Sequence, residues 1–233
     1  MSETHVTTRF AAVLLLVGAA LLLIGNTVHP VDVESSATSR LALADAGGWM
    51  PIHLTIAVGV LAVIAGLAVL ARVFHRPLAA AFARVGVVAA IVGGGALVLV
   101  FGALDGYAQA SLAGAWQASS GVEREGIETV ALALDTIDSG MTAVGILALF
   151  GVALLAFGAA LVASDVVRHW VGWAACAIGL LGVVTGTLFA ILGSTPLVIN
   201  GLFRPLALIT TVYLAVLAVA LVRVGRSTAT VPA

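Results

Sequence analysis

The stretch 48-GWMPIHLTIAVGVLAVIAGLAVLA-71 decides the fold, because its residues 52–71 contain no Asp, Glu, Lys or Arg. About 20 apolar residues in a helix cross the hydrocarbon core of a bilayer, which is roughly 30 Å thick. Lipid offers the backbone no hydrogen-bond partners, so a spanning segment of this kind has to be helical. The stretch therefore predicts a transmembrane helix, with His53 at its beginning.

The composition of the whole chain agrees with a membrane protein. Of its 233 residues, 62% are hydrophobic and 9% are charged, whereas soluble domains carry about 25% charged residues. The mean hydropathy is +1.21. The net charge of −1 and the lack of a basic block give no indication of a nucleic-acid partner. The lipid bilayer is therefore the partner that the composition predicts.

Five further apolar segments have the length of a membrane span. The six predicted spans are residues 10–28, 52–71, 85–104, 141–162, 171–192 and 206–222. The first begins after Arg9, as a signal peptide also does, but no small-x-small cleavage site follows it closely. We interpret it as a span, so the sequence predicts one all-α, polytopic domain, a bundle of six transmembrane helices.

Charged residues are distributed unevenly between the two ends of this predicted bundle. One end carries seven of the ten arginines, namely Arg9, Arg72, Arg76, Arg84, Arg168, Arg223 and Arg226. The other end carries three arginines (Arg40, Arg124 and Arg204) and nine acids: Asp32, Glu34, Asp45, Asp105, Glu123, Glu125, Glu128, Asp135 and Asp138. The positive-inside rule then predicts cytoplasmic N- and C-termini in the plasma membrane, and an even number of spans also places both termini on one side.

The two longest loops are predicted at the outer end. The first loop contains 35-SSATSRLALADAGG-48, which predicts a short helix capped by serine and stopped by the two glycines. The second loop runs from Asp105 to about Glu128. Trp49 and Trp116 near this boundary are interpreted as interfacial anchors.

Residues 122–140 predict an amphipathic helix that extends the fourth span outward. Its polar side chains recur at helical spacing and share one face. They are Glu128, Asp135, Asp138 and the following Thr142.

Polar side chains meet at the outer ends of the predicted spans. His29 closes the first span, His53 opens the second, Asp105 ends the third, and Asp135 with Asp138 precedes the fourth. In a closed bundle these five residues would line one outward-facing vestibule. Carboxylates with imidazoles suit a divalent metal ion or a proton. The alternative is that each is a solvated helix end.

Membrane histidines also serve as haem ligands. His29 with His53 at the outer end, and His75 with His169 at the inner end, resemble the pairs of a two-haem arrangement. The single Cys176 lies in an apolar run and is interpreted as a packing residue. The sequence contains no nucleophile motif and no phosphate loop, so it does not predict an enzyme.

The 26 glycines lie largely within the spans. In lipid, small residues let helix backbones approach closely. The triplet 93–95 interrupts the third span, and Gly182-x-x-x-Gly186 has the spacing of a helix-packing motif. Close helix packing is therefore predicted.

Several short motifs carry a resemblance to a known family. They are "HP" at 29–30, W-x-x-x-H at 49–53, "DGYA" at 105–108, Trp116, "LFGVALLAFGAALVAS" at 149–164 and "HWVGWAACAIGLLG" at 169–182. In this order they resemble a family of small, uncharacterised six-span integral membrane proteins of bacteria, especially actinobacteria, and archaea. The resemblance implies a six-helix membrane bundle, and it implies no activity and no catalytic residues.

These observations together predict a non-enzymatic bundle whose outer vestibule binds a small molecule, a lipid or an ion, as a transporter-like or accessory protein. Two alternatives stay open. One is a membrane redox protein with histidine-bound haem or a quinone, and the other is a membrane enzyme with an Asp/His metal site.

Overall fold

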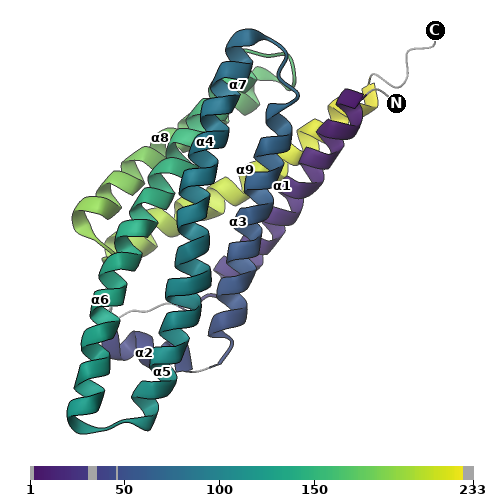
Figure 1. The fold of residues 1–233 in the computed structure, drawn as a ribbon. Coiled ribbons are helices and arrows are strands. Elements are labelled where there is room, and N and C mark those ends of the chain that lie inside the picture. The colour runs from purple at the N-terminus through teal and green to yellow at the C-terminus, as the bar shows by residue number, and fades with distance from the viewer. Residues whose placement is uncertain (1–2, 31–35, 46, 228–233) are drawn as a thin grey trace.

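The computed structural model describes residues 3–30, 36–45 and 47–227, which form an elongated bundle of helices (Figure 1). Six helical rods are long and apolar enough to cross a membrane. They are His5–Val28, Trp49–Ala71, Pro77–Ala118, Gly121–Val162, His169–Leu192 and Leu197–Arg223. The predicted all-α, six-span membrane bundle is thereby confirmed. Two of the predicted outer acids, Asp32 and Glu34, lie outside the described residues.

Three of these rods contain a π-helical stretch, which makes the described chain twelve helical elements. In chain order they are α1 (Glu3–Val28), α2 (Ala37–Asp45), α3 (Trp49–Ala71), α4 (Pro77–Leu99), η1 (Val100–Ala108), α5 (Gln109–Ala118), α6 (Gly121–Gly145), η2 (Ile146–Ala153), α7 (Leu154–Val162), α8 (His169–Leu192), η3 (Leu197–Phe203) and α9 (Arg204–Ser227). The η segments are the π-helical ones, and π-helical turns are rare and often found at functional sites.

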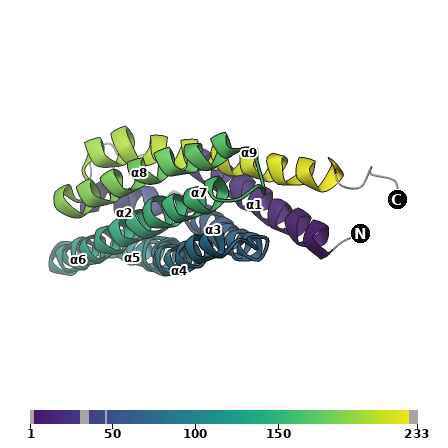
Figure 2. The same cartoon turned by 90° about the horizontal axis from the view of Figure 1, so that it is seen from above.

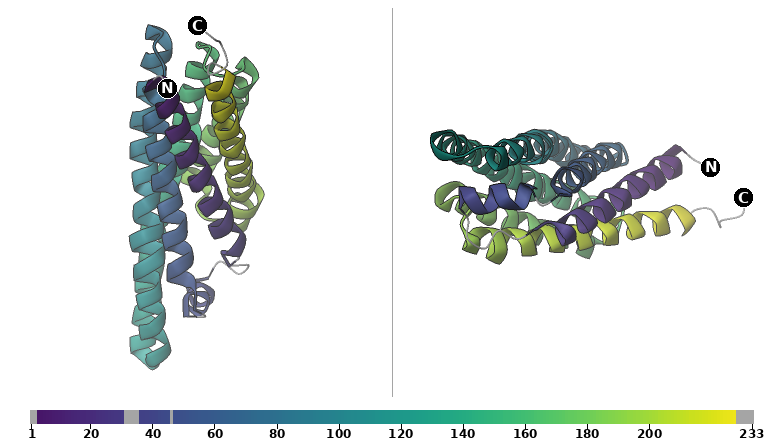
Figure 3. Two further views of the ribbon diagram at one scale, coloured as in Figure 1. Left: turned by 90° about the vertical axis from the view of Figure 1, so that its right-hand side faces the viewer. Right: turned by 90° about the horizontal axis from the view of Figure 1, so that it is seen from below.

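Both ends of the chain lie at the same end of the bundle, as an even number of spans requires (Figure 1). The opposite end carries a cap, which we define as α2, α5 and the first half of α6. The left view of Figure 3 shows the α4–α5 rod projecting farthest at this end. Its 42 residues correspond to about 63 Å of helix, roughly twice the thickness of the hydrocarbon core.

The cap has a small hydrophobic core of its own, made of Leu41, Ala44, Trp49, Ala113, Trp116 and Ala131. Trp49 and Trp116 are each 5% exposed. The prediction that these two are interfacial anchors is therefore wrong, because both rings are buried where α2 meets the long rods.

The predicted second outer loop is also wrong. Residues 109–118 are α5, and after a short turn α6 begins at Gly121, whose φ of 59° is the left-handed conformation that glycine tolerates. The segment QASLAGAWQA is weakly apolar, so it does not look like a membrane span. It stays helical because it contains four alanines and because Ala113 and Trp116 pack in the cap core.

The short helix predicted in the first loop is confirmed as α2. Ser36 precedes it, and the Ser36 hydroxyl accepts the backbone N–H of Ser39 at 3.1 Å, an N-terminal cap. The helix ends at Asp45, and Gly47 and Gly48 follow with φ of 84° and 77°. These positive φ values turn the chain into α3.

The helices are longer than the predicted apolar spans. Their polar or alanine-rich ends are helical too, but hydropathy marks only the apolar part of each helix. The amphipathic extension predicted at 122–140 is continuous with the fourth span, as α6 runs from Gly121. The glycine triplet at 93–95 does not interrupt the third span either. A Cβ on Gly93 would lie 2.4 Å from the backbone nitrogen of Leu149, so this glycine permits close approach of α4 and η2.

A similar close approach joins the fourth and fifth spans. A Cβ on Gly182 of α8 would lie 2.3 Å from the carbonyl oxygen of Phe150. Figure 2 shows α8 running beside α6 and α7, with α1 crossing the bundle obliquely toward the termini. Backbone contact at glycine therefore holds the rods together where lipid offers no hydrophobic driving force.

Candidate functional site

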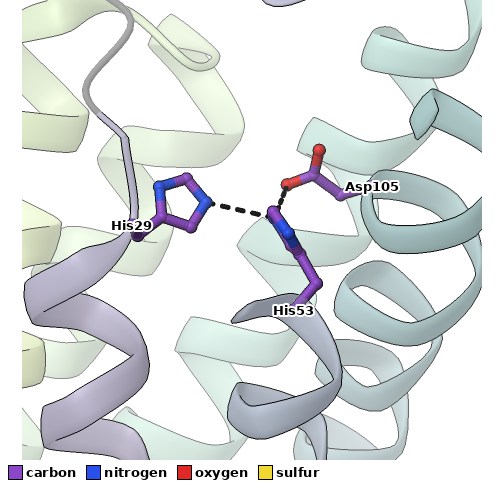
Figure 4. A group of neighbouring side chains, drawn as sticks. All are labelled: His29, His53 and Asp105. Atoms are coloured by element: carbon purple, nitrogen blue, oxygen red, sulfur yellow. Dashed lines mark hydrogen bonds and ion pairs between the residues drawn. The ribbon is translucent and has the colours of Figure 1, made fainter. Parts of the chain in front are cut away.

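His29, His53 and Asp105 meet at the base of the cap, although they come from three different elements (Figure 4). The Nε2 atoms of the two histidines are 3.1 Å apart. The His53 Nε2 atom is also 2.9 Å from Oδ2 of Asp105. One side-chain atom from each residue thus lies within 4.8 Å of the other two.

His53 is held by the first turn of α3. Its side chain is fully buried, and its Nδ1 lies 2.8 Å from the backbone oxygen of Trp49. The Trp49 indole packs on the imidazole with ring centroids 4.5 Å apart, and the Phe101 ring follows at 6.1 Å. The imidazole therefore has one orientation, with Nε2 toward the other two side chains.

His29 follows the last residue of α1. Its Nδ1 lies 2.7 Å from the backbone oxygen of Pro30. The Arg204 guanidinium at the start of α9 donates through Nη2 to the oxygens of His29 and Pro30, at 3.5 and 3.3 Å. Burial lowers the pKa of His29 below its ordinary value, and the charge of His53 acts in the same direction while Asp105 opposes it. The neutral imidazole is thus favoured at this position.

Asp105 lies within the π-helical segment η1. The Trp49 indole N–H donates to the Asp105 carbonyl oxygen at 2.6 Å, which ties η1 to the beginning of α3. The next residue, Gly106, allows close packing of η1 on His53: a Cβ there would lie 2.3 Å from the oxygen of Phe101 and 3.2 Å from Cβ of His53. The π-helical turn displaces the Asp105 side chain around the axis relative to an unbroken α-helix.

The hydrogen bonds to the backbone fix the tautomer of both histidines. A carbonyl oxygen only accepts, so the Nδ1 atoms of His29 and His53 carry hydrogens and donate to Pro30 and Trp49. In the neutral imidazole, Nε2 then has no hydrogen and carries a lone pair. The Nε2 atom of His53 lies 3.1 Å from Nε2 of His29 and 2.9 Å from the Asp105 carboxylate oxygen, and one ligand atom from each residue lies within 4.8 Å of the other two. With both imidazoles neutral these three atoms are all acceptors, so the arrangement requires a cation among them, either a proton on His53 Nε2 or a metal ion.

A cavity of about 150 Å³ adjoins this cluster. Its polar lining is His29, Asp105, Asp135, Asp138, Arg40, Arg204, Asn26, Asn200, Thr142 and Ser194. Its apolar lining includes Leu43, Ile56, Phe101, Phe189, Ile199 and Phe203. Arg40 of α2 forms an ion pair with Asp135 of α6. The Asp138 Oδ1 atom is buried and has no hydrogen-bond partner among the described residues.

The five predicted vestibule residues are thus brought together. His29, Asp105, Asp135 and Asp138 line the cavity, and His53 lies behind its wall, bonded to His29 and Asp105. Sequence reasoning missed the roles of three further residues: Trp49 as a support of His53, Arg40 as the partner of Asp135, and Arg204 as a contact of the His29 backbone. The spacing of Trp49 and His53, one helical turn apart, was the available signal for the first of these.

The predicted haem pairs do not fit these positions. Axial nitrogens on opposite faces of a haem are about 4 Å apart, with the macrocycle between them. The Nε2 atoms of His29 and His53 are only 3.1 Å apart, and their rings are in direct contact with centroids 4.8 Å apart. His75, in the connection between α3 and α4, and His169, at the beginning of α8, are both exposed.

Fold and site together define a six-span membrane protein with a partly buried cluster of two histidines and one aspartate beneath a helical cap. Comparisons with protein-family models, with curated proteins and with solved structures found no match for this chain.

Proposed function

We propose that this protein binds a divalent transition-metal ion through His29, His53 and Asp105. The observation that carries the proposal is the convergence of the two Nε2 atoms and one carboxylate oxygen, with His53 Nε2 3.1 Å from His29 Nε2 and 2.9 Å from Asp105 Oδ2. Imidazole and carboxylate are ligands of Zn²⁺ and related ions. Ligand atoms about 2.0–2.1 Å from a tetrahedral zinc ion lie about 3.3 Å from one another. The two separations that involve His53 Nε2 are close to this spacing, and the third, between His29 and Asp105, is at most 4.8 Å.

The surroundings of the two histidines support the same conclusion. Imidazoles that bind metals usually donate their second ring N–H to a carbonyl or carboxylate, which fixes the ring and its tautomer. His29 donates to Pro30 and His53 donates to Trp49 in this way. A histidine that served only as a polar helix end would not need both ring nitrogens held.

The orientation of the site in the membrane forms a second part of the proposal. Six arginines of the described residues belong to the end of the bundle where both termini lie: Arg9, Arg72, Arg76, Arg84, Arg168 and Arg223. The positive-inside rule then favours cytoplasmic termini in the plasma membrane and a metal site that faces the outside. The vestibule is an outward-facing binding site in this arrangement.

Apolar packing below the cluster favours binding over passage of an ion. Ile56 and Phe101 line the inner side of the cavity. Farther along the bundle lie Val60, Leu97 and Ile146, each at most 2% exposed. A divalent ion has a high desolvation cost among such side chains. The protein therefore binds a metal ion at its outer end, and the apolar packing below the cluster disfavours passage of the ion through this part of the core.

Metal analysis of the purified protein tests the proposal. After dialysis against Zn²⁺ and then a weak chelator in detergent micelles, the wild type should retain one zinc ion per chain. His29→Ala, His53→Ala and Asp105→Asn should each lose it, while His75→Ala, which alters an exposed histidine at the other end, should retain it. Circular dichroism and gel filtration would show that each variant is folded. A wild type that retains no zinc, cobalt or nickel would refute the proposal.

A further inference from the structure

We infer that the bound metal ion keeps a coordination position open toward the cavity, and that a small monocarboxylate occupies it with Arg204 as its counter-ion. This inference rests on the proposed function. Among the described residues, the cluster offers three ligand atoms. Zinc and similar ions take at least four ligands, and a site with three protein ligands leaves the fourth position to water or a bound molecule.

The open position faces the cavity because of where the three ligands lie. His29 and Asp105 belong to the cavity wall, and His53 is fully buried behind them. The Trp49 and Phe101 rings lie against His53 and also form part of the cavity wall. An ion held by all three ligands therefore has protein on the His53 side and the cavity on the other.

The charges around the cavity favour a singly charged anion. The metal contributes two positive charges and Arg204 one, while Asp105 contributes a negative charge and so does Asp138 when it is ionised. Arg40 and Asp135 neutralise each other as an ion pair. The sum is one positive charge with Asp138 ionised, which a monocarboxylate balances and a phosphate dianion exceeds, and it is two with Asp138 protonated.

Arg204 is placed to hold a carboxylate. Its guanidinium lies over the backbone of the proposed metal ligand His29, and among the described residues it donates only through Nη2, at 3.3 Å or longer. A guanidinium has five N–H donors in a planar fork that matches a carboxylate. Arg204 also lines the cavity, so the remaining donors are available beside the metal position.

The size and the apolar wall of the cavity define the rest of the ligand. Its volume is about 150 Å³, and an engineered apolar cavity of roughly this volume holds benzene. Phe189, Phe203 and Ile199 form part of the lining, and the Phe189 and Phe203 rings pack edge to face at 6.3 Å. A carboxylate with a short aliphatic or aromatic body of about six carbons fits this lining.

Cobalt spectroscopy tests the inference with defined probes. Purified protein is loaded with one equivalent of Co²⁺, and its visible bands are followed while benzoate, acetate or phosphate is added. Benzoate should change the bands at the lowest concentration, acetate should need about tenfold more because it lacks the apolar body, and phosphate should bind more weakly than benzoate. Bands unaltered by tens of millimolar benzoate would refute the inference, as would phosphate binding more tightly than benzoate.

Two substitutions should change benzoate affinity in opposite directions. Arg204→Gln removes the attractive charge and should weaken benzoate binding about tenfold. Asp138→Asn removes a repulsive charge and should strengthen it. The matched control is Arg76→Gln, which breaks an exposed ion pair with Asp165 and should have no effect on benzoate affinity.

The cobalt stoichiometry separates this inference from the proposed function. If cobalt binds and benzoate does not, the open carboxylate site is refuted while the metal site stands. If the wild type binds no cobalt, the metal site itself fails. The Arg204→Gln protein could lose cobalt because Arg204 also supports the His29 backbone. In that case the benzoate affinity of the Asp138→Asn protein tests the charge argument. Weaker benzoate binding in Asp138→Asn, or loss of the metal in that variant, would show that Asp138 is a ligand and would overturn the charge argument.

Discussion

The carbonyl oxygen of Trp49 accepts a hydrogen bond from His53, while the indole of the same residue packs on the His53 ring with centroids 4.5 Å apart. The indole N–H also donates to the backbone of Asp105. A single residue at the beginning of α3 therefore positions two of the three proposed metal ligands. Residues that orient metal ligands affect metal affinity nearly as strongly as the ligands themselves, so Trp49 belongs to the proposed site.

Trp49→Phe should lower metal affinity about tenfold without abolishing binding. Phenylalanine keeps an aromatic ring against His53 but cannot donate to the Asp105 carbonyl, and loss of such an outer contact typically costs 10- to 100-fold. A competition titration with a fluorescent zinc chelator would measure it. The matched control is Trp116→Phe, which removes an indole hydrogen bond to Glu128 elsewhere in the cap. Equal affinities for the two variants would contradict the positioning role of Trp49.

Gly106→Ala should destabilise the protein and disturb the cluster. The added Cβ would collide with the Phe101 carbonyl oxygen at 2.3 Å and crowd His53, and overpacking of this kind costs about 1–3 kcal/mol. Thermal unfolding in detergent micelles, followed by circular dichroism, should show a melting temperature lower by several degrees.

Gly102→Ala provides the control within the same π-helical segment. A Cβ at Gly102 meets nothing within 4 Å, so alanine there should be neutral or stabilising by up to about 1 kcal/mol. Similar melting temperatures for the two alanine variants would mean that close packing at Gly106 is not what positions Asp105.

The ion pair between Arg40 of α2 and Asp135 of α6 should stabilise the packing of α2 against α6. Its side chains are 20% and 26% exposed, so solvent screens the pair less than one at the surface. A double-mutant cycle of Arg40→Gln and Asp135→Asn should give a coupling energy of about 1 kcal/mol. The cycle can be measured by SDS-driven unfolding of the detergent-solubilised protein.

Arg76 and Asp165 offer a comparison for that cycle. This second pair is 60% and 72% exposed, and the coupling between Arg76→Gln and Asp165→Asn should be near zero. A coupling at Arg40–Asp135 no larger than this would indicate that α2 is held by the apolar cap core alone.

The orientation of the bundle can be tested by cysteine labelling. Cys176→Ala removes the single native thiol, and one cysteine is then introduced at Gly126 in the cap or at His75 between α3 and α4, both exposed. A membrane-impermeant maleimide added to intact cells should label the first and spare the second. Labelling of the His75→Cys protein instead would invert the proposed topology.

Much of the fold could be predicted from hydropathy alone. Each span is an apolar run that only a helix can form in lipid, so the number of spans follows from residues 10–222. The cap could not be predicted in the same way. The segment containing Ala113 and Trp116 is too polar for a span, and its helical state depends on docking against Leu41 of α2, a contact between residues far apart in the sequence.

The candidate site was predictable as a set of residues but not as a geometry. The ends of three spans place His29, His53 and Asp105 at about one depth, and this could be predicted from the sequence. The direction of the Asp105 side chain depends on the π-helical turn of η1, which no hydrophobic period reveals. Likewise, the carbonyl partners that fix the histidine tautomers depend on where α1 ends and α3 begins.

Zinc K-edge X-ray absorption on protein loaded with one equivalent of Zn²⁺ tests the central claim most directly. If His29, His53 and Asp105 hold the ion, the spectrum should contain the multiple scattering of two imidazoles and nitrogen or oxygen ligands about 2.0–2.1 Å from the metal. His53→Ala should lose the imidazole signal or the zinc, and His75→Ala should leave the spectrum unchanged. A zinc shell without imidazole scattering, or with the same scattering in the His53→Ala protein, would contradict the account.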